Sequence, residues 1–224
     1  GIYDKIKDFI TGYNNIINKM TKLYNADSAG NYEPLTDDEK SEMSDSEIEK
    51  WETKIKDSLL RRDSTLSTVM SAMTTATVNG KTYFLSNFGI STLGYMNAAE
   101  NEQNAYHIDG DEDDENTSGN TDKLMTALNS DPDTVMDFMK QMATNLYNAI
   151  DKQMTRTTLR SKYSIYNDKE MTTQYKNYTT TIKEWETKIS DKEDYYYKKF
   201  SSMESALSKL NSQTSSLSGL FGSN

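Results

Sequence analysis

The C-terminal end of the chain carries a heptad repeat that limits the folds open to the protein. Between residues 200 and 221 the side chains on one helix face follow each other at steps of three and four residues: Phe200, Met203, Leu207, Leu210, Thr214, Leu217 and Phe221. The same frame continues upstream through residues 182–196. A helix with this spacing presents a narrow apolar stripe that packs against a partner helix. The repeat therefore predicts a helix that needs a partner.

The residues beside this stripe are weak helix formers. From Ser201 onward the only charged residues are Glu204 and Lys209, and most of the others are Ser, Gln, Asn or Thr. Ser and Asn each cost roughly 0.5 kcal/mol relative to Ala in a helix. Two interpretations follow, the last helix of a small bundle or a tail that becomes ordered only on assembly.

Composition narrows the class of protein. Apolar residues make up 34% of the 224 residues, and the net charge is −10. This apolar content is low for a compact globule and typical of elongated helical proteins, which bury narrow stripes. The acidic charge disfavours nucleic acid and anionic membrane surfaces as partners. The absence of cysteine excludes disulfides, thiol catalysis and cysteine-ligated zinc.

A second heptad opens the chain and predicts a helix over residues 2–24. We expect its apolar stripe to form an intramolecular coiled-coil seam made of Ile2, Ile6, Phe9, Tyr13, Ile16, Met20 and Leu23, which Ile10, Ile17 and Tyr24 widen. Capping boxes at Thr36 and Ser44 predict a short helical turn and then one long helix from Asp45 to about Thr77.

The second half of the chain also reads as helical. Thr121 or Asn120 is expected to cap a short helix, and Asp131 with Pro132 to begin a longer one. A break is expected between residues 156 and 167, where Asn167 and Glu170 would cap the final helix. We expect a helical core domain over residues 1–200 and an assembly tail over residues 201–224.

The middle of the chain has a different pattern. Asn79-Gly80 is a hairpin signal, and residues 82–85 read as a strand. Residues 88–90, 93–95 and 106–108 are further extended candidates. The predicted fold class is therefore mainly α, an elongated helical bundle or coiled coil with a small β element within residues 78–120.

Sites for chemistry are few. The single histidine, His107, has no nucleophile elbow to accompany it, so we expect no catalytic residue. Asp109, Asp111 and Asp113 have the 1, 3, 5 spacing of a calcium loop, but the positions that require Gly and Glu hold Asp114 and Asn120. We therefore expect a solvated acidic loop from Asp109 to Asn116 and beyond, with no metal and no cofactor.

Five segments share motifs with one protein family. They are residues 6–14, which end in Tyr-Asn; residues 63–66, Asp-Ser-Thr-Leu; residues 85–92, Leu-Ser-Asn-Phe-Gly-Ile-Ser-Thr; residues 124–135, which contain Ala-Leu and Asp-Pro; and the tail over residues 196–217. In this order and spacing they resemble the flagellar filament cap protein, hook-associated protein 2, with Asn87 as a departure from its pattern. The resemblance extends from about Ile2 to Phe221.

The resemblance implies a structural role without enzyme activity. The family caps the growing tip of the bacterial flagellum, forms a ring of identical subunits and helps exported flagellin to fold and polymerise. Implied partners are a second copy of itself, flagellin, filament-junction proteins and an export chaperone on the tail. The implied location is extracellular, at the filament tip, after export through the flagellar type III apparatus, and some members contact mucus or host surfaces.

The resemblance also implies helices and outward domains ahead of residue 1, so we read the chain as the C-terminal portion of a longer protein. Its tail would then be the assembly interface, formed by Phe200, Met203, Leu207, Leu210, Leu217 and Phe221. Alternatives are another export-linked coiled-coil protein, such as a flagellin relative, a junction protein or a needle-tip protein, and a calcium-binding adhesin based on the acidic loop.

Overall fold

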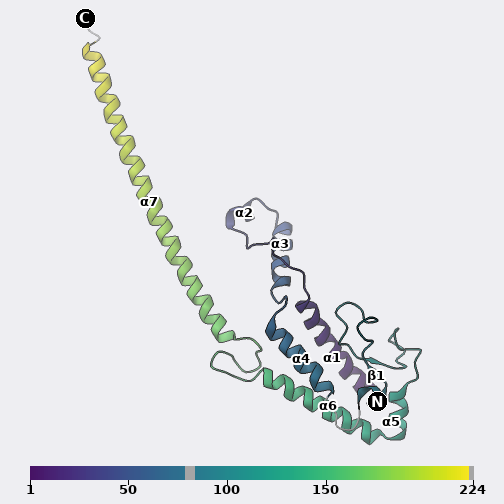
Figure 1. Cartoon of the computed structure of the whole chain (residues 1–224). Helices are drawn as coiled ribbons and strands as arrows, with labels where there is room; N and C mark the ends of the chain where they lie inside the picture. Colours follow the sequence, from purple (N-terminus) through teal and green to yellow (C-terminus); the bar gives the residue numbers. More distant parts are fainter. Residues whose placement is uncertain (79–83, 222–224) are drawn as a thin grey trace. The chain divides into compact units, whose positions relative to one another are not determined.

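The computed structural model describes residues 1–78 and 84–221, and helices make up most of it (Figure 1). The elements are α1 (Ile2–Tyr24), α2 (Asp37–Ser41), α3 (Asp45–Ser58), α4 (Ser64–Val78), the 3-10 turn η1 (Leu85–Phe88), β1 (Ile90–Ser91), β2 (His107–Ile108), α5 (Lys123–Ser130), α6 (Pro132–Gln153) and α7 (Asp168–Phe221). The predicted mainly α fold with a small β element is confirmed.

The chain forms two units. The first contains residues Gly1–Thr157 and Ser161–Tyr166, and the second contains Thr158–Arg160 and everything from Asn167 on. The break between α6 and α7 lies where the sequence predicts it, between Gln153 and Asp168. Helix α7 is continuous across residue 200, where we expected the assembly tail to begin, so that expected boundary is not a break in the backbone.

Helices α1, α4 and α6 enclose one half of the core of the first unit. Its buried side chains are Tyr13 and Ile17 from α1, Val69, Met73 and Ala76 from α4, and Leu146 from α6. The buried positions of α1 are Ile6, Ile10, Tyr13, Ile17 and Thr21. They follow the 3.6-residue period of a helix with neighbours on more than one side, rather than the 3.5-residue period of a two-helix seam.

The residues of the predicted α1 seam therefore lie in different surroundings. Ile6 and Tyr13 are buried, and Phe9, Met20 and Leu23 are partly buried. Ile2 is 41% exposed and Ile16 is 52% exposed. The neighbours Ile10 and Ile17, which the sequence placed at the edge of the stripe, lie at the centre of the buried face.

The single long helix predicted from Asp45 to Thr77 is wrong, because the structure breaks it between α3 and α4. Arg62 has a positive φ of 56°, and its amide donates to the carbonyl of Tyr24 at 2.9 Å. The Asp63 carboxylate then accepts from the amide of Leu66 at 2.7 Å, which caps the start of α4. These contacts end α3 and redirect the chain onto α1.

The second half of the core contains the β element. Leu85, Phe88, Ile90, Ile108 and Leu124 pack against Ile6 and Ile10 of α1 and against Val135, Phe138, Met139 and Met142 of α6. Strands β1 and β2 are antiparallel, with Ile90 opposite Ile108. Gly89, at φ 69°, turns the chain from η1 into β1, where a Cβ would meet the Cβ atoms of Lys123 and Asp109 at 3.1 and 3.2 Å.

Parts of the predicted β element need correction. Asn79, Gly80 and residues 81–83 lie outside the described residues. The described end of the predicted strand over residues 82–85 is wrong, since Leu85 begins the 3-10 turn. The extended segment predicted over residues 93–95 is also wrong, because Gly94 begins a turn whose carbonyl accepts from Asn97 and Ala98.

Local capping explains how α5 and α6 begin. Asp122, rather than the predicted Thr121 or Asn120, caps α5 by accepting from the amide of Met125 at 2.7 Å. Asp131 caps α6 as predicted, accepting from the amide of Thr134 at 3.1 Å, and Pro132 follows at the first helical position. Both caps satisfy amide groups that a helix N-terminus leaves without partners.

Asn14 joins α1 to the segment that leads into β2. Its side-chain nitrogen donates to the carbonyl of Tyr106 at 2.7 Å, and its side-chain oxygen accepts from the amide of Tyr106 at 2.8 Å. The Tyr106 hydroxyl in turn lies 2.8 Å from the hydroxyl of Thr77 on α4. A polar side chain on α1 thus supplies both hydrogen-bond partners of the Tyr106 backbone in the irregular segment before β2.

Replacing Asn14 by alanine is expected to destabilise the first unit by about 1–3 kcal/mol. The change leaves the partly buried amide and carbonyl of Tyr106 without partners, and a buried unsatisfied group costs about this much. Urea unfolding measures the loss, with the exposed Asn15→Ala as the matched control. Equal stability of the two variants would contradict the assigned role of Asn14.

Candidate assembly surface

Helix α7 is the main candidate for a functional surface. Its 54 residues form one helix of roughly 80 Å at 1.5 Å per residue. Every described side chain from residue 171 to residue 216 is exposed. The residues of the heptad frame are 51–58% exposed: Ile182, Ile189, Tyr196, Phe200, Met203, Leu207 and Leu210. A long apolar stripe therefore lies open within the second unit.

The predicted tail interface falls on this helix. Phe200, Met203, Leu207 and Leu210 lie at successive turns of α7 at the predicted steps of three and four residues. The backbone of Leu217 and Phe221 continues the same helix. The structure therefore aligns the predicted interface residues along one continuous helix, in which residue 200 marks no change of conformation.

The upstream half of α7 adds aromatic side chains that the predicted interface did not include. Trp185, Tyr195 and Tyr196 border a shallow groove of about 770 Å³ along this helix. Lys188 and Lys199 lie over the rings of Trp185 and Tyr195, at 4.5 and 5.1 Å from the centroids. Trp185 and Tyr195 each lie one position before a residue of the heptad frame, so they widen the stripe that Ile182, Ile189 and Tyr196 form.

The polar residues of α7 are satisfied locally. Threonine and serine hydroxyls donate to the carbonyl four residues earlier, as in Thr187 to Lys183 at 2.9 Å and Thr214 to Leu210 at 2.9 Å. Such bonds add little to helix stability and can bend a helix. Between residues 171 and 216, no ion pair is found among the described side chains. Packing of the apolar stripe is therefore the main source of stability open to α7.

The acidic loop after β2 belongs to the first unit and is held against α1. Lys7 of α1 pairs with Asp111 and with Asp113, the latter at 2.6 Å. The hydrogen bonds to these two carboxylates hold the pKa of Lys7 above its ordinary value. The Lys7 ammonium therefore occupies the place between these two carboxylates that a bound cation would take.

His107 is part of the same arrangement. Its Nδ1 lies 2.6 Å from a carboxylate oxygen of Asp114. Burial acts to raise the pKa of Asp114, but hydrogen bonds from His107 and from the amide of Asn116 bring it below its ordinary value. Among the described residues no three metal-ligating side chains gather in one place, so the calcium alternative finds no cage in the part of the chain described.

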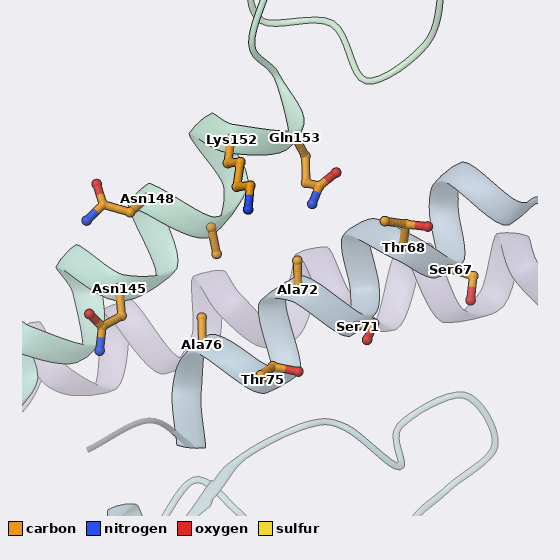
Figure 2. Close-up of a pocket in the computed structure, with 11 residues that line it drawn as sticks. Ser67, Thr68, Ser71, Ala72, Thr75, Ala76, Asn145, Asn148, Lys152 and Gln153 are labelled. Carbon is orange, nitrogen blue, oxygen red and sulfur yellow. The ribbon is translucent and has the colours of Figure 1, made fainter. Parts of the chain in front are cut away.

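A further groove lies between α4 and α6 (Figure 2). It has a volume of about 780 Å³ and a lining of short or polar side chains, among them Ser71, Ala72 and Ala76 of α4 and Asn145 and Lys152 of α6. Figure 2 shows these side chains spaced along two neighbouring helices rather than converging on a point. The groove holds no arrangement of nucleophile, base and acid.

A long helix with an exposed heptad stripe is typical of proteins whose helices pack against partner helices. No helix in the described part of the chain is long and apolar enough to cross a bilayer. The sequence matches the family described as "Flagellar hook-associated protein 2 C-terminus" over residues 1–212. The chain therefore belongs to this family.

One relative is much longer than the segment that it shares with this chain. The chain is 29% identical over 154 residues to the flagellar hook-associated protein 2 of Halalkalibacterium halodurans. The match covers 66% of this chain and 26% of the relative, so the chain spans about a quarter of the relative's length. No solved structure matches the chain.

Proposed function

We propose that this chain forms the C-terminal part of a protein that caps the distal tip of a bacterial flagellar filament, and that α7 is its assembly surface. In this role the protein self-associates as a ring at the filament tip and promotes the folding and polymerisation of flagellin. Membership of the hook-associated protein 2 family supports the location at the flagellum. The role is structural, and no step of it requires an enzyme site.

The exposed apolar stripe of α7 is the observation that carries this proposal. Burying a large apolar side chain fully contributes about 1.5–3 kcal/mol. Four side chains of the stripe are each more than half exposed: Phe200, Met203, Leu207 and Leu210. The second unit alone therefore lacks most of the stabilisation that their burial would give. Partner helices from the rest of the protein or from neighbouring subunits would bury these side chains.

The tail after Ser201 is expected to be cleaved readily in the dilute monomer of the full-length protein and protected in its assembled form. An unsupported helix with weak helix formers opens often, and proteases cut the open form. Trypsin cleavage after Lys209, followed by mass spectrometry, measures the difference. Cleavage within α1 is the internal control, since its buried contacts are the same in both states.

Equal protection of Lys209 in the monomer and in the assembled form would contradict the assembly-coupled tail. A monomer whose tail resists trypsin must already have covered the stripe within its own chain. The full-length protein is required for this experiment, because the comparison depends on a form that assembles at the filament tip.

A further inference from the structure

The segment between α1 and α4 projects from the first unit as a separate arm (Figure 1). This acidic arm, residues 25–63, includes α2 and α3, and neither helix contains a buried residue. Its order comes from local contacts. The Trp51 indole donates to the carbonyl of Glu33 at 2.8 Å, the ring of Tyr32 packs on Trp51 at 4.7 Å, and Lys40 pairs with Glu52 at 3.0 Å.

The acidic arm carries most of the chain's negative charge. Residues 25–63 contain twelve acidic and six basic residues, a net charge of −6 out of −10 for the whole chain. Helix α3 also has an apolar row, Ile48, Trp51 and Ile55, which are partly buried, and Leu59 directly after the helix is 69% exposed. An amphipathic helix with no fully buried residue has an apolar face that a partner can cover further.

A groove on the acidic arm combines these two properties. It has a volume of about 750 Å³, with Tyr32, Met43 and Trp51 in its apolar lining. The charged side chains that line it are Glu47, Glu49, Asp57, Lys50 and Lys54. An apolar centre with a polar rim is the usual composition of a protein–protein interface. Because the arm as a whole is acidic, the matching surface would present aromatic or aliphatic side chains together with basic residues.

Such a surface lies at the end of α6. The basic patch consists of Lys152, Arg156 and Lys162, and the Lys162 ammonium lies over the ring of Tyr163 at 4.6 Å from its centroid. Tyr147 is 66% exposed and Tyr163 is 69% exposed. The amide of Tyr163 donates to the carbonyl of Met154 at 3.1 Å, which holds the patch at the end of the helix. Residues 152–163 contain four basic and no acidic residues.

We propose that the acidic arm of one copy of this chain docks on the basic patch of a second copy. The two surfaces are opposite in charge, and each carries exposed apolar groups that the other can cover. Among the described ion pairs, none joins the arm to Lys152, Arg156 or Lys162 within one chain. The contact uses two different surfaces, so it leads from each copy to the next and gives a ring if the rotation between successive copies closes.

The inference rests on the self-association that the proposed function includes, and charge reversal tests it. The variants are E49K/D57K on the arm and R156E/K162E on the patch, and analytical ultracentrifugation of the chain between about 1 µM and 1 mM measures self-association. Each pair of reversals is expected to weaken it about tenfold, because like charges then face each other. The four changes combined are expected to restore it. Added salt is expected to weaken the wild-type contact.

The control is E112K/E115K in the acidic loop, which changes the net charge by the same amount as the arm variant. Both glutamates are exposed, and self-association is expected to be unchanged. The docking contact is wrong if the wild-type chain and both reversal variants associate equally. It is also wrong if the combined variant associates no more tightly than either pair of reversals. In both cases the proposed function stands. A wild-type chain that stays monomeric throughout also overturns the contact, and the trypsin experiment then decides the proposed function independently.

Discussion

Replacing Ile17 by alanine is expected to lower the free energy of unfolding of the first unit by about 2–5 kcal/mol. Ile17 is 0% exposed and packs among Tyr13, Val69, Met73 and Leu146, where α1, α4 and α6 meet. Truncation removes apolar contacts and leaves a cavity that three helices cannot easily close. Urea unfolding and hydrogen exchange of the α1 and α4 amides measure the loss.

The neighbouring change Ile16→Ala is the matched control. Ile16 has the same side chain on the same helix and belongs to the predicted heptad seam, but it is 52% exposed. Its replacement is expected to change the free energy of unfolding by less than about 1 kcal/mol. A loss for Ile16→Ala as large as that for Ile17→Ala would mean that the heptad seam, and not the face seen in the structure, is buried.

The sequence predicts those elements whose signals are local. The start of α6 follows from Asp131 and Pro132, and α1 follows from an apolar period sustained over more than twenty residues. The period is less informative about which side of α1 is buried. Apolar residues at both Ile16 and Ile17 satisfy a helical pattern, and only the positions of α4 and α6 decide between them.

Elements that depend on distant contacts are not predictable in this way. Residues 59–63 continue a helical pattern, and the break occurs because the Arg62 amide bonds to the carbonyl of Tyr24 while its guanidinium lies 5.1 Å from the Tyr24 ring. In the same way, the acidic loop is ordered by Lys7, which is 104 residues from Asp111 in the sequence. Neither partner can be identified from the residues next to it.

The candidate assembly surface on α7 is predictable from the sequence in part. The heptad period predicts which residues share one face of α7, since spacing alone determines this. That these residues form an interface stays a prediction. The exposure of the stripe from Ile182 onward could not be predicted, because it depends on which helices lie beside α7. Residues 182–200 belong to the helical core domain predicted over residues 1–200, and in the structure their side chains are exposed within the second unit.

Replacing Leu207 and Leu210 by serine is expected to abolish assembly of the full-length protein at working concentrations. Both side chains are more than half exposed in this chain, and the proposed function has them buried in the assembled form. Losing two such burials would cost about 3–6 kcal/mol, which weakens association by a factor of about 10²–10⁴. Ultracentrifugation measures assembly, and complementation of a strain that lacks the protein measures filament growth.

The folded monomer itself should tolerate this change, because neither leucine contacts the core of the first unit. Unfolding of the first unit in urea is therefore expected to be the same as in the wild type. The control variant S205A/K209S changes two residues on the opposite side of the same turns and is expected to assemble normally. If L207S/L210S assembled as well as this control, the heptad stripe would not be the assembly surface, whichever helices lie against it.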